Sequence, residues 1–174
     1  MLDHLLSRDC DPSRYVSVTY DDQAATFLLW NLSGQCVGYL IYRPDGTKER
    51  CNDREKSKYY VRIGTENDDG RRDGRDRLAV WGLETYHRAK VLYITEGLFN
   101  AATIHACGHA AIAVLANDPK HLRSWLNTLP NKIIAVCDGD DASKKLAKYA
   151  DEVIVCPPGT DANELGVEKM RKLL

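Results

Sequence analysis

The chain has 174 residues, of which 44% are hydrophobic and 28% charged, and its formal net charge is −1. These values fit one globular domain or two small lobes. The longest apolar run, 110–116, is far short of the ~20 residues that cross a membrane, and the amino-terminal sequence lacks the basic region of a secretory signal. We therefore expect a cytoplasmic protein with no membrane partner.

The cysteines and the distribution of charge indicate what kind of protein this is. Six cysteines are scattered without a C-x-x-C pair, which favours reduced thiols over a zinc site or a disulfide framework. Residues 1–42 carry a net charge of −3, residues 43–90 of +3 and residues 91–174 of −1. A basic middle segment beside an acidic carboxyl half is compatible with a nucleic-acid surface next to a metal site, or with a solvated charged face.

The first half of the chain predicts a short helix at 2–7 followed by strands. The strands are expected at 15–20, 25–31, 35–42 and 59–63. Gly34 suits a hairpin loop that needs positive φ, and the Pro-Asp-Gly sequence within 43–46 predicts a β-turn. Residues 66–77 hold nine charged residues and two glycines without periodicity, which predicts a loop.

From residue 90 the pattern changes to alternating strands and helices. Strands are expected at 90–95, 110–115, 132–138 and 152–156, and helices at 97–107, 118–128, 141–149 and 162–173. Repeated strand–helix units of this length imply a parallel sheet with right-handed crossovers. We therefore predict an α/β protein with a strand-rich lobe at 1–88 and a parallel-sheet domain at 89–174.

Three carboxylates stand at the ends of two predicted strands. The strand at 132–138 is continuously apolar, as a strand buried on both faces is, and it ends in Asp138 and Asp140. Glu96 ends the strand at 90–95. Because ligands collect beyond the carboxyl ends of parallel strands, these oxygens predict a Mg²⁺ site.

Each acidic position also has a purely structural interpretation. Glu96 could bind metal or act as a general base, or it could stabilise a helix amino terminus through the helix dipole. Asp138 and Asp140 would repel each other without a cation, although they could be a turn acid and a helix cap. Asp161 or Asn163 could reach the same site, or either could be the N-cap of the last helix.

The sequences TEG, DGD and TDANEL, in this order, resemble the Toprim domain, a catalytic fold shared by bacterial-type primases, topoisomerases and some nucleases. The resemblance matches Glu96 to the family's strand-end glutamate and Asp138 and Asp140 to its D-x-D pair. Asp161 resembles the later acidic position, in the form closest to bacteriophage primase-helicases. The implied fold is Rossmann-like, with a mainly parallel four-stranded sheet and flanking helices.

The upstream lobe is similar to the RNA-polymerase core of DnaG-type and bacteriophage primases. Residues 31–39 look like the primase pattern N-x-x-G-x-x-x-G-F, residues 58–60 like K-Y-L and residues 80–83 like L-Y-G-L. The resemblance covers roughly residues 25–170, nearly the whole chain. It points to a protein encoded by a phage or mobile element.

The resemblance implies a DNA primase, a nucleotidyltransferase that makes short RNA primers on single-stranded DNA during replication. Mg²⁺ or Mn²⁺ would be held by the matched carboxylates, with ribonucleoside triphosphates as substrates. Lys58 would face template or nucleotide, and Arg43 matches a second basic position with an offset of one residue. Arg77 matches only by neighbourhood. A replicative helicase and a zinc-binding module would be partners on separate chains.

Three departures from the primase pattern leave other functions open. Asn100 stands where primases have an aspartate, residues 115–118 replace a glycine-bearing loop, and residues 141–143 alter the end of the D-G-D motif. One alternative is a Toprim nuclease that uses the same carboxylates, with water as the nucleophile. The other is a non-catalytic Toprim replication accessory that binds nucleic acid or a helicase.

Overall fold

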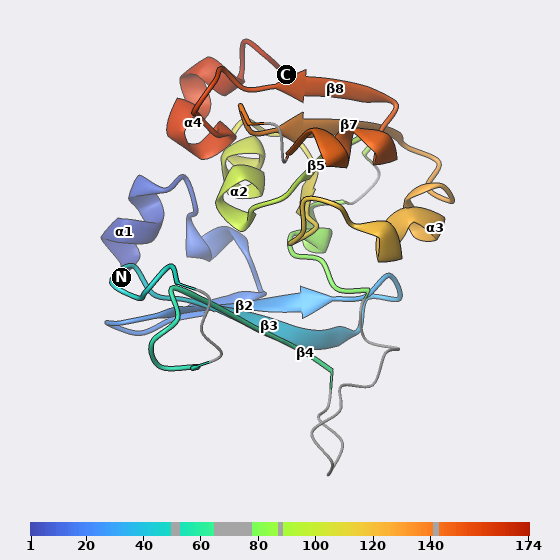
Figure 1. Ribbon diagram of the computed structural model, residues 1–174. Helices are drawn as coiled ribbons and strands as arrows, with labels where there is room; N and C mark the ends of the chain where they lie inside the picture. The colour runs from blue at the N-terminus through green and yellow to red at the C-terminus, as the bar shows by residue number, and fades with distance from the viewer. Residues whose placement is uncertain (50–52, 65–77, 87–88, 141–142) are drawn as a thin grey trace. The chain divides into compact units, whose positions relative to one another are not determined.

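The computed structural model describes residues 1–49, 53–64, 78–86, 89–140 and 143–174 (Figure 1). Contacts divide the chain into two compact units, one of Met1–Leu5 with Asp11–Ala79 and the other of Leu6–Cys10 with Val80–Leu174. The functional boundary that we predict near residue 88 stays a prediction. The predicted loop at 66–77, which includes Arg77, lies outside the described residues.

The first unit is built on an antiparallel sheet. The chain opens with α1 (Leu2–Ser7) and the 3-10 turn η1 (Pro12–Arg14). The sheet has the order β1-β2-β3-β4, with β1 at Val18–Tyr20, β2 at Ala25–Trp30, β3 at Cys36–Tyr42 and β4 at Tyr59–Ile63 (Figure 1). The predicted strand at 15–20 is shorter in the structure because Asp11 and Pro12 start a turn that Tyr15 closes.

Buried and partly exposed residues alternate along β2, which shows which face of this sheet is buried. Ala25, Phe27 and Leu29 are completely buried, whereas the residues between them are partly exposed. Gly34 has φ of 72° in the hairpin between β2 and β3, and its N–H donates to the Asn31 carbonyl at 3.0 Å. The predicted hairpin glycine is therefore confirmed, because the positive φ suits a residue without Cβ.

The second unit is built on a parallel four-stranded sheet in the order β6-β5-β7-β8. Its strands are β5 (Val91–Thr95), β6 (Ala111–Ala113), β7 (Lys132–Cys137) and β8 (Glu152–Val155). After its first residue β7 is wholly buried, as its continuous apolar sequence predicts. The predicted class, an α/β protein with a parallel four-stranded sheet preceded by a strand-rich lobe, is confirmed.

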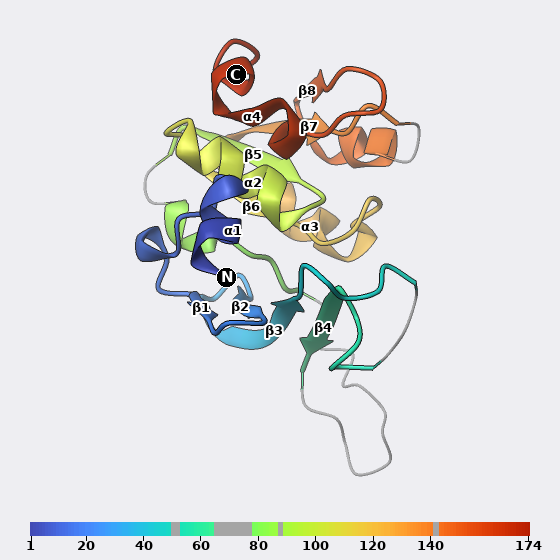
Figure 2. The ribbon, with the colours of Figure 1, turned by 90° about the vertical axis from the view of Figure 1, so that its left-hand side faces the viewer.

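Both α-helices and shorter 3-10 helices occur between and around these strands. The elements are η3 (Leu83–Thr85), α2 (Leu98–Ala106), η4 (Lys120–Leu122), α3 (Arg123–Leu126), η5 (Ser143–Tyr149) and α4 (Ala162–Met170). Helix α2 packs against β5, β6 and α4, and Figure 2 shows α4 beside it. No helix within the described ranges is both long and apolar enough to span a bilayer.

Two predicted α-helices differ in the structure. The segment at 118–128 folds into η4 and a one-turn α3 because Pro119 constrains its start and Pro130 follows its end. In the segment at 141–149, the described part is the 3-10 helix η5, which buries Leu146 and Tyr149. Their spacing of three residues is the period of a 3-10 helix, so this form places both side chains on one face.

Candidate functional site

The acidic residues lie where neighbouring strands of the parallel sheet end. β5 and β7 pair in parallel, with Ile94 opposite Ala135, so their carboxyl ends lie next to each other. Glu96 follows β5 directly, and the buried Thr95 shapes the turn there by donating its hydroxyl to the Gly97 carbonyl at 2.9 Å. Asp138 follows β7 in the same way. The sheet topology thus brings together the two strand ends that carry the predicted carboxylates.

Gly139 docks the end of β7 onto the loop that follows β8. Its N–H donates to the Thr160 carbonyl at 2.9 Å, and a Cβ at this position would lie 2.0 Å from the Pro157 oxygen. Only glycine allows so close a backbone approach. Because Asp161 comes directly after this contact, the approach draws Asp161 toward Asp138.

The electrostatics show that these carboxylates share one region. Burial, followed by the charges of Asp161, Glu96 and Asp140, raises the pKa of Asp138 from its ordinary 3.8 to about 6, while a hydrogen bond from Asn100 opposes the rise. Burial and the charge of Asp140 also raise the pKa of Glu96. A set of carboxylates that raise one another's pKa is a region of negative potential to which a cation would be attracted.

Two buried thiols sit against this region. Burial and the nearby Asp138 raise the pKa of Cys137 to about 11 and the pKa of Cys156 to about 12. Thiols with such pKa values are protonated at neutral pH and are neither nucleophiles nor ready metal ligands. The cysteines within the described residues form no disulfide with one another, and Cys51 lies outside those residues.

The donor set suits Mg²⁺ chemically, although it does not form a dedicated cage. Within the described residues, no three His, Cys, Asp or Glu side chains converge as a group that could hold a metal ion by themselves. Mg²⁺ usually keeps several waters and uses one or two carboxylates together with substrate phosphates, so Glu96, Asp138 and Asp140 need not all be direct ligands. Carboxylate chemistry and mutual repulsion therefore fit a hydrated divalent cation.

Asp161 combines the two interpretations that the sequence leaves open. Its side chain accepts from the Glu164 N–H at 2.8 Å, and the Glu164 side chain accepts from the Asp161 N–H at 3.2 Å, which together make a capping box at the start of α4. The same carboxylate is close enough to Asp138 to raise its pKa. Asp161 is thus an N-cap by its hydrogen bonds, and its charge adds to the acidic region.

Asn100 is the residue of this site whose role the residue pattern by itself does not predict. It is 5% exposed, and its amide N–H donates to Asp138 Oδ1 at 2.9 Å. Two sequence signals point to it: it stands where primases have an aspartate, and it comes four residues after Glu96, at the start of α2. The neutral amide donates to Asp138 where an aspartate would repel it.

The loop after β6 stores backbone strain beside the site. Leu115 has φ of 58°, in the left-handed region, and its N–H donates to the Glu96 carbonyl at 3.0 Å. A leucine in this conformation costs on the order of 1 kcal/mol relative to glycine. The hydrogen bond ties this loop, which departs from the primase pattern, to the backbone of the candidate metal ligand.

The basic candidates Arg43 and Lys58 are neighbours in the first unit. The Arg43 N–H donates to the Lys58 carbonyl at 2.9 Å. The turn at 43–46 also lies close to the Lys58 backbone, because a Cβ on Gly46 would lie 2.6 Å from the Lys58 Cα. The Lys58 ammonium lies 6.0 Å from the centroid of the Tyr42 ring. The strand ends therefore bring the two predicted phosphate-binding residues together.

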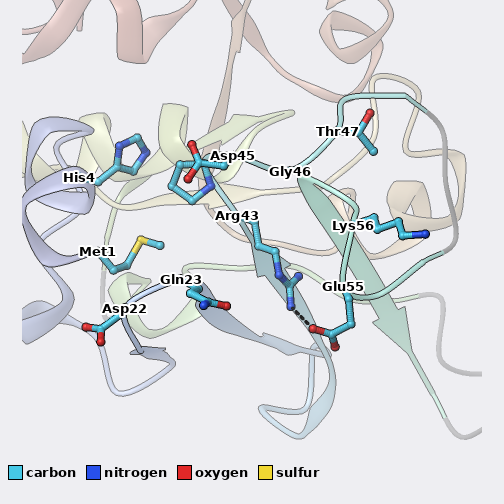
Figure 3. Close-up of a pocket in the computed structure, with 11 residues that line it drawn as sticks. Met1, His4, Asp22, Gln23, Arg43, Asp45, Gly46, Thr47, Glu55 and Lys56 are labelled. Atoms are coloured by element: carbon cyan, nitrogen blue, oxygen red, sulfur yellow. Dashed lines mark ion pairs between the residues drawn. The ribbon is translucent and has the colours of Figure 1, made fainter.

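Arg43 lines an open cavity of about 890 Å³ in this unit. Figure 3 shows its guanidinium directed at Glu55, with Nη2 3.5 Å from the Glu55 carboxylate. Its side chain is only 16% exposed, and Nη1 is buried without a hydrogen-bond partner among the described residues. A guanidinium presents its N–H donors in a planar fork that suits oxyanions, although Nη1 itself is covered by protein atoms here. The cavity is lined by Met1, His4, Asp22, Gln23, Arg43, Pro44, Asp45, Gly46, Thr47, Glu55 and Lys56.

Known proteins are similar to this chain in structure rather than in sequence. No profile of a known protein family matches the chain, and no curated protein matches it. Among solved structures, the chain is similar to the DnaG catalytic core, with 20% identity and a TM-score of 0.57 over 98% of this chain and 57% of that one. It is also similar to the RNA polymerase domain of Mycobacterium tuberculosis primase DnaG, with 18% identity and a TM-score of 0.56 over 99% of this chain and 62% of that one.

A third similarity is to a phage protein. The primase fragment of the bacteriophage T7 primase-helicase protein has 15% identity and a TM-score of 0.58 over 90% of this chain and 65% of that one. The chain therefore spans between 57% and 65% of the length of these three structures. At such low identity the similarity concerns the fold, and the chain has the fold of the catalytic cores of DnaG-type and bacteriophage primases.

Proposed function

We propose that this chain is the RNA-polymerase core of a DNA primase, which makes short RNA primers on single-stranded DNA during replication. The observation that carries the proposal is the acidic region at the ends of β5 and β7, on a fold shared with primase catalytic cores. In this proposal the second unit is a Toprim domain, and the division at residue 88 separates it from a lobe that binds template and nucleotide.

Glu96, Asp138 and Asp140 would hold Mg²⁺ or Mn²⁺, with Asp161 contributing its charge. A divalent ion in this position stabilises the charge of a transferring phosphoryl group and lowers the pKa of an attacking hydroxyl. Glu96 could accept the proton of a primer 3′-hydroxyl, since burial raises its pKa. Asp138, whose pKa is about 6, would bind the ion as the pH rises above that value.

The basic residues would bind the phosphates of template and nucleotide. The place of Arg43 in the lining of its cavity supports this role, and Lys58 would add a second charge beside it. Arg77, which lies outside the described residues, joins them by its place in the sequence. Single-stranded DNA and ribonucleoside triphosphates would be the ligands, with a replicative helicase and a zinc-binding module as partners on separate chains. The protein would act in the cytoplasm, or in the host cytoplasm if a phage encodes it.

The test is incorporation of labelled ribonucleotides on mixed-sequence single-stranded DNA with Mg²⁺ or Mn²⁺. Wild type should make short oligoribonucleotides, and Asp138→Ala should make about 100-fold less or none. Asp118→Ala is the matched control, because Asp118 bonds to Tyr149 and does not belong to the acidic region. Full activity of Asp138→Ala would contradict the site, and degraded template without added nucleotides would indicate a nuclease.

One observation favours a second candidate, a non-catalytic accessory that binds nucleic acid. Asn100 occupies the position of a family aspartate, so the acidic region has one carboxylate fewer than the primase pattern, and a neutral amide contacts Asp138 instead. Absence of primer synthesis, together with DNA binding that does not depend on Mg²⁺ or Mn²⁺, would support the accessory. Primer synthesis by wild type would exclude it.

A further inference from the structure

A chain of hydrogen bonds leads from Asp138 into the interior of the second unit. Its first link is the Asn100 amide, which donates to Asp138 Oδ1 at 2.9 Å. The second link fixes the other end of the same amide, because Asn100 Oδ1 accepts from the backbone N–H of Asn163 at 3.2 Å. An amide is the only short side chain that can donate at one end and accept at the other in this way, so its orientation is set by its two partners.

Asn163 is held in turn by residues far away in sequence. Its amide N–H groups donate to the Arg8 carbonyl at 2.9 Å and to Thr103 Oγ1 at 2.9 Å, and its carbonyl oxygen accepts from Arg8 Nε. Thr103 is completely buried and donates its hydroxyl to Asp9 Oδ2 at 2.9 Å. Asn100, Asn163 and Thr103 therefore each have a partner at both ends, which is the condition under which a buried polar network adds rigidity.

The segment that carries Arg8 and Asp9 packs within the same unit. Leu6–Cys10 groups with Val80–Leu174 by its contacts, and the Arg8 guanidinium lies 4.3 Å from the centroid of the Phe99 ring. Phe99 precedes Asn100 on α2, and it is 3% exposed. Arg8 thus contacts both Asn163 and the residue that precedes Asn100, so it helps to hold the start of α2.

We propose that Asn100 is a positioning residue for Asp138, and that Asn163 and Arg8 hold Asn100 in the orientation that this requires. The bond to Oδ1 selects one rotamer of Asp138 and keeps its carboxylate at the mouth of the acidic region. Loss of a hydrogen bond that orients a metal ligand commonly changes metal affinity by about 10- to 100-fold. The inference rests on the proposed function, since it concerns the divalent cation that Asp138 would bind.

The experiment measures Mn²⁺ and Mg²⁺ binding to the full chain by calorimetry, with no nucleotide present. Asn100→Ala should weaken Mn²⁺ binding about tenfold. Asn163→Ala keeps the backbone N–H that donates to Asn100 but loses the side-chain bonds to Arg8 and Thr103 that hold this backbone, so it should weaken Mn²⁺ binding less, by about threefold. Asn131→Ala is the control: Asn131 also bonds at both ends, accepting from the Tyr86 hydroxyl and donating to the Ala89 carbonyl, but not to an acidic residue. It should lower stability and leave the dissociation constant unchanged.

A substitution that keeps the shape separates positioning from packing. Asn100→Asp can still accept from Asn163 but replaces the donor to Asp138 by a repelling charge, so the metal-free protein should melt at a lower temperature. Added Mn²⁺ should then raise the melting temperature by more than it does in wild type, because the ion neutralises the new charge. This variant and Asn163→Ala keep the test decisive if Asn100→Ala does not fold.

The outcomes are distinct. Unchanged Mn²⁺ affinity in Asn100→Ala and Asn163→Ala, with wild-type binding intact, would overturn the positioning role and leave the proposed metal site standing. Wild-type protein that binds neither ion would overturn the metal site itself, and the positioning role with it. A loss of affinity in Asn131→Ala equal to that in Asn100→Ala would show a general effect of destabilisation and would also overturn the inference.

Discussion

At Gly139, the D-G-D motif needs a residue without a side chain because of packing. A Cβ there would lie 2.0 Å from a backbone oxygen, which cannot move as the end of a flexible side chain could. Gly139→Ala should therefore lower the free energy of unfolding by about 2–4 kcal/mol. Urea denaturation followed by circular dichroism measures the change.

Gly97 in the T-E-G motif is the matched comparison. Its φ is −95° and its ψ is 146°, an extended conformation open to any residue, and a Cβ would meet only the Asn100 side chain at 3.6 Å. Neither the backbone conformation nor the packing at this position therefore needs a glycine. Gly97→Ala should cost less than about 1 kcal/mol; a loss as large as that of Gly139→Ala would contradict the packing argument.

Asp138 makes the stability of the metal-free protein depend on pH. Its folded pKa of about 6 lies above the ordinary 3.8, so the folded state binds more protons than the unfolded state between these values. Stability should therefore fall as pH rises from about 4 to 6, by about 1 kcal/mol after solvent screening of this half-exposed group. Asp138→Asn should remove this fall in denaturation experiments in EDTA.

Asp118 provides a control of opposite sign. Its hydrogen bond from the Tyr149 hydroxyl lowers its pKa, so the charged form of Asp118 stabilises the folded state above pH 3.8. Asp118→Asn should leave a protein that is less stable at neutral pH and no less stable below the lowered pKa. If Asp138→Asn and Asp118→Asn shifted stability at pH 7 in the same direction, the assignment of Asp138 as a destabilising charge would be wrong.

Among the secondary-structure elements, α4 allows the capping role of Asp161 to be tested separately from the effect of its charge. Asp161→Ala removes the capping box and should cost about 1 kcal/mol, whereas Asp161→Ser keeps an N-cap acceptor and should cost only a few tenths. If Asp161 also attracts the ion, Asp161→Ser should weaken Mn²⁺ binding despite its stability. Equal Mn²⁺ affinity in wild type and Asp161→Ser would restrict this residue to the helix cap.

For the whole molecule, the near-zero net charge hides a basic segment that should govern DNA binding. Residues 43–90 carry +3 within a chain of net charge −1. Binding of single-stranded DNA should weaken about tenfold from about 50 to about 200 mM salt, and Arg43→Ala or Lys58→Ala should each reduce the logarithmic salt slope by about 0.7. Lys120→Ala, at a side chain 82% exposed in the second unit, should leave the slope unchanged. Fluorescence anisotropy gives the slopes.

The parts of the fold that could be predicted depend on local and repeated signals. Continuous apolar runs predict the buried β5 and β7, and their order along the chain predicts a parallel sheet with carboxylates at one edge. The form of the helices at 118–128 and 141–149 is harder to predict from the sequence, because a few buried side chains decide between an α-helix and a 3-10 helix. Such side chains are chosen by packing partners that lie elsewhere in the chain.

The sequence by itself determined the α/β class, the hairpin at Gly34, the acidic strand ends and the resemblance to primases, because each depends on residues close together in the chain or on strand order. Only the tertiary structure decided that Asn100 donates to Asp138 and that Arg8 contacts Asn163, 155 positions away. It also decided that Gly139 docks on the Pro157 backbone. The physical reason is that hydrogen bonds and close contacts of this kind depend on distances of a few ångströms between segments whose approach is set by the whole core.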